Sequence, residues 1–470
     1  MNLELADFAV REGLNLGAGY VEARMESETG KGFLLKNGIP EVAGINFEEG
    51  LSVRFLKGKA MGFISTNELS KDAVSRLLRQ GISRLHAANG INADVSFSVE
   101  KASAADYTVK QKTDIMDVSD GEKFNHLIQL YRNIKKAEPS LLTAHFSFSN
   151  RIREKLFVSS EGARIHAELP ELSFFYLISV GRGSNTMQHM WQYGGSGGFE
   201  LFHGWELEKK LASRVKALAK VLEEGKPLKP GSYDVVCGPE VTGLMSHESV
   251  GHPYEADRIL GREAAQAGES FITPEMRGTR IGSEHVTVID DPTMPGSYGF
   301  YLYDEEGVKA GPRTLIDRGI IGEFLHNRES AAQLGTRSNA AARASDYGKE
   351  PIIRMANTYV KPGSFSDDEL FESIKQGVYV KSFMEWNIDD KRFNQKYVGA
   401  ESYLIENGKI TSPVRNPVLE LTTPALWKSV DAVGKKPEFH AATCGKGEPM
   451  QGIPVFHGGP NIRLRNIRMK

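Results

Sequence analysis

The chain has few cysteines, no long apolar run and no excess of charge of one sign. Only Cys237 and Cys444 occur among its 470 residues, which argues against a disulfide scaffold and leaves each thiol to be judged singly. No apolar run approaches the roughly 20 residues of a membrane-spanning helix. The N-terminus also lacks the basic region of a secretory signal peptide. We therefore expect a cytoplasmic protein with no membrane partner.

The charge balance excludes a global field that would attract nucleic acid. The chain has 58 basic and 60 acidic residues, for a formal net charge of -2, so DNA, RNA and anionic membranes are not favoured as partners. No segment interleaves aromatic residues with lysine and arginine as a single-strand binder would. We expect no direct nucleic-acid partner, and the functional sites must be read from local motifs.

Helical and strand-like segments are segregated along the chain. Helical spacing covers residues 3–16, the segment after Ser70, residues 122–137 and residues 205–224, and Ser366 with Glu369 forms a capping box for a further helix. Strand-like segments turn at Asn37-Gly38, Glu161-Gly162 and Asn407-Gly408. This arrangement predicts an α+β fold with antiparallel or mixed sheets and packed helices.

Two glycine-rich segments bear on the domain organisation. The stretch 225–231 contains Gly225, Pro227, Pro230 and Gly231, which is typical of a linker. We therefore predict an N-terminal α+β domain over residues 1–225 and a C-terminal α+β domain over residues 226–470. The stretch 181–204 includes five residues that read Gly-Gly-Ser-Gly-Gly, and we expect it to be a mobile loop.

The most informative motif is His247-Glu248-Ser249-Val250-Gly251-His252, at the start of the predicted C-terminal domain. It places two imidazoles and a carboxylate within six residues. In the H-E-x-x-H zinc motif the histidines are four residues apart and share one helix face. A spacing of five separates them by roughly 140° around a regular α-helix. Gly251 and the Pro253 that follows the motif permit a widened or unwound turn there.

Two histidines need a further ligand, because a catalytic zinc site usually takes three protein ligands and leaves a position for water. Cys444 is followed by Gly445 and Gly447, where the backbone can approach closely, and a thiolate is a strong metal ligand. Cys237 lies in an apolar strand and is expected to be a core residue. Glu255 and Asp257 stay open as ligands, although hydrogen-bonding or salt-bridge roles suit them better. The weaker candidates are His285, His326, His440 and His457.

Several blocks of the chain resemble, in the same order, the TldD/PmbA family, in the TldD-like branch that carries the metal motif. Beyond residues 247–252 they are residues 290–292, 304–307, 354–359, 403–408 and 444–446. The resemblance covers nearly the whole chain. It is strongest from about residue 231 onward and weaker in the N-terminal half, where residues 50–66 match best.

The resemblance implies a zinc-dependent metallopeptidase that hydrolyses unfolded or flexible peptides. Residue by residue, His247, His252 and Cys444 match the family's metal ligands, and Glu248 matches its general acid/base. Zn²⁺ would acidify the attacking water, and Glu248 would take its proton and return it to the leaving amine. The family's dimers enclose the active site, so the expected partner is a second copy or a PmbA-like sister subunit.

An alternative function is a noncatalytic PmbA-like partner subunit or peptide-binding module. That branch typically lacks the paired histidines, so the motif favours the catalytic reading. The family's historical description as regulators of DNA gyrase finds little support in the charge balance. Two segments depart from the family pattern. Residues 384–390 replace a glycine-rich segment, which predicts different substrate contacts, and residues 447–452 form a longer loop beside Cys444.

Overall fold

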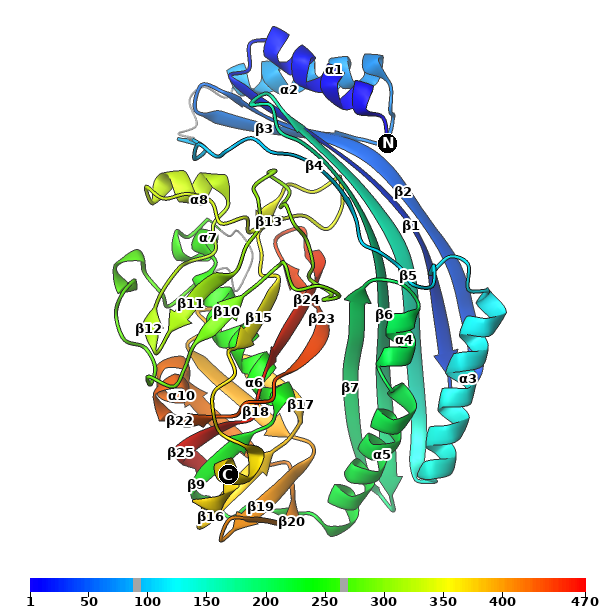
Figure 1. The fold of residues 1–470 in the computed structure, drawn as a ribbon, viewed down its shortest axis with the longest axis vertical. Helices are drawn as coiled ribbons and strands as arrows, with labels where there is room; N and C mark the ends of the chain where they lie inside the picture. Colours follow the sequence, from blue (N-terminus) through cyan, green and yellow to red (C-terminus); the bar gives the residue numbers. More distant parts are fainter. Residues whose placement is uncertain (88–93, 263–268) are drawn as a thin grey trace.

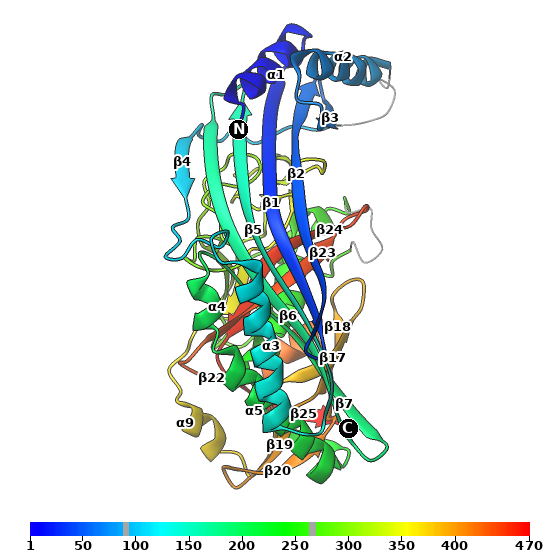
Figure 2. The same cartoon turned by 90° about the vertical axis from the view of Figure 1, so that its right-hand side faces the viewer.

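The computed structural model describes residues 1–87, 94–262 and 269–470. A long, curved sheet of seven strands dominates the N-terminal half (Figures 1 and 2), in the order β3-β2-β1-β5-β6-β4 with β7 paired to β6. Its strands are β1 (Tyr20–Lys36), β2 (Ile39–Lys57), β3 (Ala60–Thr66), β4 (Ala104–Thr108), β5 (Leu141–Ser159), β6 (Arg164–Arg182) and β7 (Asn185–Ser196). All neighbours are antiparallel except β4 and β6.

Local sequence sets the ends of these elements. Asn37 and Gly38 both have positive φ, 50° and 81°, and form the two-residue turn that fixes the β1–β2 register. Helices α1 (Leu3–Asn15) and α2 (Lys71–Ala87) pack at one end of the sheet, and α3 (Asp120–Ala137) and α5 (Leu207–Glu224) pack at the other. The side chain of Asn2 caps α1, and that of Ser119 caps α3.

The predicted mobile loop over residues 181–204 is wrong. Its central part is strand β7, which pairs with β6 over its whole length, and a short helix α4 (Glu200–Gly204) follows. The glycines mark close packing instead of mobility. A Cβ on Gly194 would lie 2.9 Å from the ring of Tyr298 and 3.1 Å from Ala441. Small residues here therefore allow the C-terminal half to approach the sheet.

The C-terminal half contains two larger sheets. The six-stranded sheet, in the order β12-β11-β10-β15-β24-β23, consists of β10 (Val288–Asp290), β11 (Arg313–Asp317), β12 (Ile320–Ile321), β15 (Asn357–Val360), β23 (Glu438–Lys446) and β24 (Gln451–Gly459). The ten-stranded sheet consists of β8 (Lys226–Pro227), β9 (Gly231–Cys237), β16 (Gln376–Val380), β17 (Phe383–Ile388), β18 (Asn394–Gly399), β19 (Ser402–Glu406), β20 (Lys409–Arg415), β21 (Val418–Thr422), β22 (Val430–Val433) and β25 (Ile462–Met469). Strands β13 (Ala342–Arg343) and β14 (Ile352–Ile353) form a separate pair.

Short helices complete the C-terminal half. They are α6 (Pro239–Ser246), α7 (Ala256–Ile259), α8 (Arg328–Gln333), α9 (Asp367–Glu372) and α10 (Thr423–Ser429). Helix α6, which leads into the histidine motif, packs against β15, β23 and β24. Antiparallel and mixed sheets with packed helices confirm the predicted α+β class. One apolar core includes both Leu218 of α5 and Val235 of β9, so the core does not divide at residue 225. The domain boundary between residues 225 and 226 stays a prediction.

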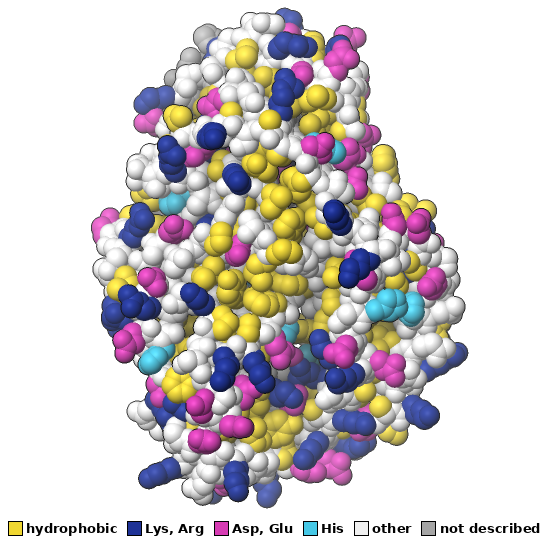
Figure 3. All heavy atoms as spheres, in the orientation of Figure 1, with side chains coloured by type: hydrophobic (Ala, Val, Ile, Leu, Met, Phe, Trp, Pro, Cys, Tyr) yellow, Lys and Arg dark blue, Asp and Glu magenta, His cyan; other side chains and the backbone are white. Residues whose placement is uncertain are grey.

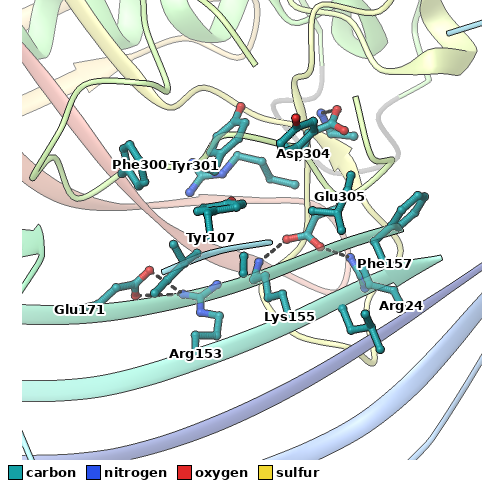
Figure 4. A pocket seen from close by; sticks show the side chains of 17 residues that line it. Arg24, Tyr107, Arg153, Lys155, Phe157, Glu171, Phe300, Tyr301, Asp304 and Glu305 are labelled. Atoms are coloured by element: carbon teal, nitrogen blue, oxygen red, sulfur yellow. Dashed lines mark hydrogen bonds and ion pairs between the residues drawn. The ribbon is translucent and has the colours of Figure 1, made fainter. Parts of the chain in front are cut away.

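Buried ion pairs join the sheet to the C-terminal half (Figure 4). Arg24 of β1 and Lys155 of β5 both bind the carboxylate of Glu305, and Arg54 of β2 lies 2.6 Å from Glu306. Separating the two halves would leave the charges of these buried pairs uncompensated, which is costly. The ion pairs therefore hold the two halves in a fixed relation. None of the helices in the described part of the chain is both long and apolar enough to cross a membrane.

Candidate metal centre

The histidine motif lies on a distorted helix. Helix α6 ends at Ser246, residues His247–Gly251 form a π-helix, and residues His252–Tyr254 form a 3₁₀-helix. The backbone N–H of His252 donates to the carbonyl of His247, which is the i+5 hydrogen bond of a π-turn. Residues five apart therefore return to one side of the helix, and the predicted widened turn is confirmed.

Gly251 makes a close tertiary contact at this turn. A Cβ at this position would lie 1.8 Å from the sulfur of Met355, so a side chain here would force the buried Met355 to move. Pro253 occupies the first turn of the 3₁₀-helix, where its missing N–H costs no hydrogen bond.

The structure brings His247, His252 and Cys444 together. The two imidazole centroids are 4.9 Å apart with the rings at 81°, and Cys444 Sγ lies 3.4 Å from His252 Nε2. One ligand atom from each residue lies within 4.8 Å of the others. Cys444 comes from β23, the edge strand of the six-stranded sheet. All three side chains are buried, so any ion held by them would be shielded from bulk water on these sides.

Electrostatics within the cluster favour a thiolate. Burial alone would raise the pKa of Cys444, but the charges of His252 and His247 hold it well below its usual range. Burial likewise lowers the pKa of His247, and the charge of Cys444 outweighs that effect and raises it. The thiolate is the form that binds metals. Two imidazoles and a thiolate form a donor set that suits Zn²⁺, and His247 Nδ1 is buried without a hydrogen bond.

Glu255 contacts the ring of His252. Its carboxylate lies 3.1 Å from Nδ1 of His252 and accepts from Nε of Arg258 at 2.8 Å. Lys446 lies 3.2 Å from Glu255 and 2.8 Å from Asp257, which ties the strand of Cys444 to the histidine segment. Glu255 and Asp257 therefore take the hydrogen-bonding and salt-bridge roles that suited them better. A carboxylate on the far nitrogen of a ligating histidine fixes its orientation and tautomer.

Glu248 faces a partner that the sequence analysis missed. Nη1 of Arg392 donates to Oε2 of Glu248 at 2.6 Å. Arg392 lies between β17 and β18 with φ of 63°, and its carbonyl accepts from Oγ1 of Thr423. It is 144 residues from Glu248 in sequence. The available signal was its position just after residues 384–390, the segment that departs from the family pattern.

The cluster, Glu248 and Arg392 line one cavity of about 360 Å³. Its other walls come from β6, β7, α6, β17, β23 and β24, and the side chains they contribute are mostly apolar. His457 lines the same cavity, with its ring centroid 6.0 Å from that of His247, and burial lowers its pKa well below the usual value. Within the described residues the metal-binding group contains neither His457 nor the other weak candidates, His285, His326 and His440. Cys237 is buried in β9, where burial raises its pKa to about 12.

Comparisons with known proteins find metallopeptidases among the proteins similar to this chain. The family model "PmbA/TldA metallopeptidase C-terminal domain" matches residues 230–470, and "PmbA/TldA metallopeptidase domain 1" matches residues 21–85. The chain is 31% identical over 445 residues to a protein of Methanocaldococcus jannaschii named a metalloprotease, covering 94% of this chain and 95% of the relative. It is 28% identical to a "zinc metalloprotease TldD homolog" of Saccharolobus solfataricus, with 98% of each chain covered. Its fold matches TldE from Thermococcus kodakarensis with a TM-score of 0.76 at 14% identity, over 99% of both chains.

Proposed function

Because the chain belongs to the PmbA/TldD family of metallopeptidases, we propose that it is a zinc-dependent peptidase acting on unfolded or flexible peptides. The observation that carries the proposal is one cavity that contains both a nitrogen, nitrogen and sulfur donor set and a carboxylate. His247, His252 and Cys444 would hold the ion, and Glu248 would be the general acid/base. Bound Zn²⁺ would polarise the scissile carbonyl and lower the pKa of a water.

Residues of the chain itself would position the reacting groups and transfer the proton. Arg392 holds Oε2 of Glu248, which orients the carboxylate and leaves Oε1 to take the proton from the water and return it to the leaving amine. Glu255 orients the ring of His252. The half-buried strand β7 covers the cavity from the side of the N-terminal sheet, which restricts the access of bulk water to the reacting atoms.

The position of the cavity favours extended substrates. Strand β23 is the edge of its sheet. Residues 441–445 of this strand, which include Cys444, line the cavity. An exposed strand edge can pair with the backbone of an extended peptide with little dependence on side chains. Most backbone groups of a folded protein are already hydrogen-bonded within its own structure, so we infer that the substrate is an unfolded or flexible segment.

We also propose that the chain works as a dimer, with a second copy or a PmbA-like sister subunit. Two surface features support a partner. Apolar side chains gather along the middle of the face in Figure 3, where the sheet meets the C-terminal half. In addition, β3 pairs with residues 51–57 of β2, and no strand among the described residues pairs with the outer edge of the first part of β2. The exposed apolar side chains on that part are Ile39, Val42, Ile45 and Phe47. The cytoplasmic location stays a prediction.

Peptide cleavage by wild type and Glu248→Gln tests the proposal. Both proteins are loaded with Zn²⁺ and incubated with a pool of unstructured peptides, and new termini are read by mass spectrometry. Fragments from wild type alone support hydrolysis with Glu248 as acid/base. Fragments from both proteins contradict the role of Glu248. If neither cleaves, alone or with a PmbA-like subunit, while peptides still bind, the noncatalytic binding module is the better description.

A further inference from the structure

Three aromatic side chains form a continuous wall beside the metal centre. The ring of Trp191 on β7 lies 5.5 Å from that of Phe383 on β17, and Phe383 lies 5.5 Å from Trp386, both in edge-to-face geometry. All three line the cavity that contains Glu248 and Cys444. The wall is therefore part of the space that a substrate must enter.

A β-bulge directs this wall into the cavity. Phe383 and Trp386 are three residues apart, and in a regular strand they would point to opposite faces. The pairing of β17 with β18 shifts register between Phe383 and Glu385, which adds one residue and turns Phe383 and Trp386 to the same side. Glu385 faces away and lies 3.2 Å from Lys396. Bulges of this kind re-aim side chains next to active sites.

The wall is incompletely covered within the described chain. Trp386 remains 37% exposed, whereas Phe383 and Trp191 are 6% and 7% exposed. The cavity of about 360 Å³ has room for a large side chain. The wall continues into further apolar residues, namely Phe175, Met190 and Leu244. Among the described residues that line the cavity, Arg392 is the only lysine or arginine, and it is paired with Glu248. The wall itself consists of uncharged side chains.

We propose that the wall of Trp191, Phe383 and Trp386 is a subsite for one large apolar side chain of the substrate, such as leucine, methionine or phenylalanine, next to the scissile bond. The proposal rests on the proposed peptidase function and gives it a substrate class: flexible peptides that carry such a residue. Backbone pairing with β23 would hold the peptide, and the subsite would select where along it the bond is cut.

Cleavage-site mapping followed by matched kinetics tests the subsite. The zinc-loaded full-length chain digests a pool of unstructured peptides, and we expect large apolar residues at one fixed position relative to the cut. Two peptides that differ only in phenylalanine or alanine at that position are then compared. Trp386→Ala should lower kcat/KM roughly tenfold for the phenylalanine peptide, since a large side chain loses its contacts, and leave the alanine peptide within about twofold.

Matched variants separate selection from general damage. Trp386→Phe keeps an aromatic wall and should restore most of the preference. Glu385→Ala lies on the same strand but faces outward, and it should preserve both rates. Cuts without regard to apolar residues, or an equal loss for both peptides in Trp386→Ala, would overturn the subsite.

A binding measurement keeps this test independent of turnover. Two zinc-loaded proteins are compared, Glu248→Gln and the double variant Glu248→Gln with Trp386→Ala. For each protein we measure the affinity for two peptides of equal length, one rich in apolar residues and one without them. A preference that Trp386→Ala removes supports the subsite even if wild type hydrolyses nothing, an outcome that would overturn the peptidase function alone. Equal affinities would overturn the subsite itself.

Discussion

Arg392 and Glu248 form an ion pair of 2.6 Å across the metal-site cavity, although 144 residues separate them. Both side chains are largely buried, where an ion pair is screened less by salt than at the surface. The guanidinium contacts only one carboxylate oxygen. It can therefore fix the orientation of Glu248 while the other oxygen exchanges a proton.

Removing this ion pair should impair catalysis without removing the metal. For Arg392→Gln we expect kcat to fall by roughly 10- to 100-fold, because a mispositioned acid/base loses much of its contribution. Arg392→Lys keeps the charge but not the fork geometry and should recover part of the rate. Zinc content should equal that of wild type. Unchanged kcat in a folded Arg392→Gln protein would contradict the positioning role.

Glu255 should set the affinity of the site for its metal. Glu255→Gln removes the negative charge that faces Nδ1 of His252, and losses of roughly 10- to 100-fold in metal affinity follow from such changes. Competition with a chromogenic chelator measures the affinity, and circular dichroism controls for folding, because Arg258 and Lys446 lose a buried counter-ion. Wild-type affinity in a folded variant would show that Glu255 does not orient the ligand.

Two buried histidines should make the fold sensitive to mild acid. Burial lowers the pKa of both His326 and His440 to about 4, against about 6.5 in an unfolded chain. Between these values the unfolded state binds more protons, so stability is full above pH 6.5 and falls as pH drops toward 4. Each histidine contributes a slope of about 1.4 kcal/mol per pH unit in this window.

Urea unfolding measures the contribution of the two histidines to stability. Wild type and the double variant His326→Gln with His440→Gln are compared at pH 7, 6 and 5. The difference in the free energy of unfolding between the two proteins should narrow or reverse as the pH falls, because glutamine does not titrate. A constant difference across these pH values would mean that neither histidine is held neutral in the folded state.

The free edge of β2 should be part of the dimer contact. Ile45 and Phe47 are 78% and 63% exposed, so Ile45→Glu and Phe47→Glu should leave the fold intact. We expect either change to shift a dimer to monomer at micromolar concentration, measured by light scattering. Ile410→Glu, another exposed isoleucine on β20, is the control and should remain dimeric. A dimer that tolerates charges at both β2 positions would place the contact elsewhere.

Features set by neighbouring residues could be predicted from the sequence. The Asn37-Gly38 turn and the Ser366 and Glu369 capping box are present as predicted, because their hydrogen bonds and dihedral angles are local. The widened turn at His247 to His252 is also present, but Gly251 and His252 both keep right-handed helical dihedral angles, so the turn does not depend on an unusual backbone conformation at either residue. The α+β class also follows, since it depends on the order of helical and strand-like segments.

Features set by tertiary contact could not be predicted in this way. Strand β7 could not be recognised because its end is rich in glycine, which is equally typical of a loop, and the contact of Gly194 with Tyr298 and Ala441 appears only in the folded structure. The pairing of Arg392 with Glu248 depends on how the β17–β18 hairpin packs. Cys444 is favoured over Glu255 partly through the family resemblance, because no spacing relates Cys444 to His252, which is 192 residues away.

The most direct test of the account is the coordination of zinc in the purified full-length chain. X-ray absorption at the zinc edge should show one sulfur at about 2.3 Å and two imidazole nitrogens at about 2.0–2.1 Å, and Cys444→Ser should remove the sulfur shell. Bound zinc that lacks sulfur and imidazole neighbours, or a wild-type chain that hydrolyses peptides equally well after zinc is removed, would contradict a catalytic centre at His247, His252 and Cys444.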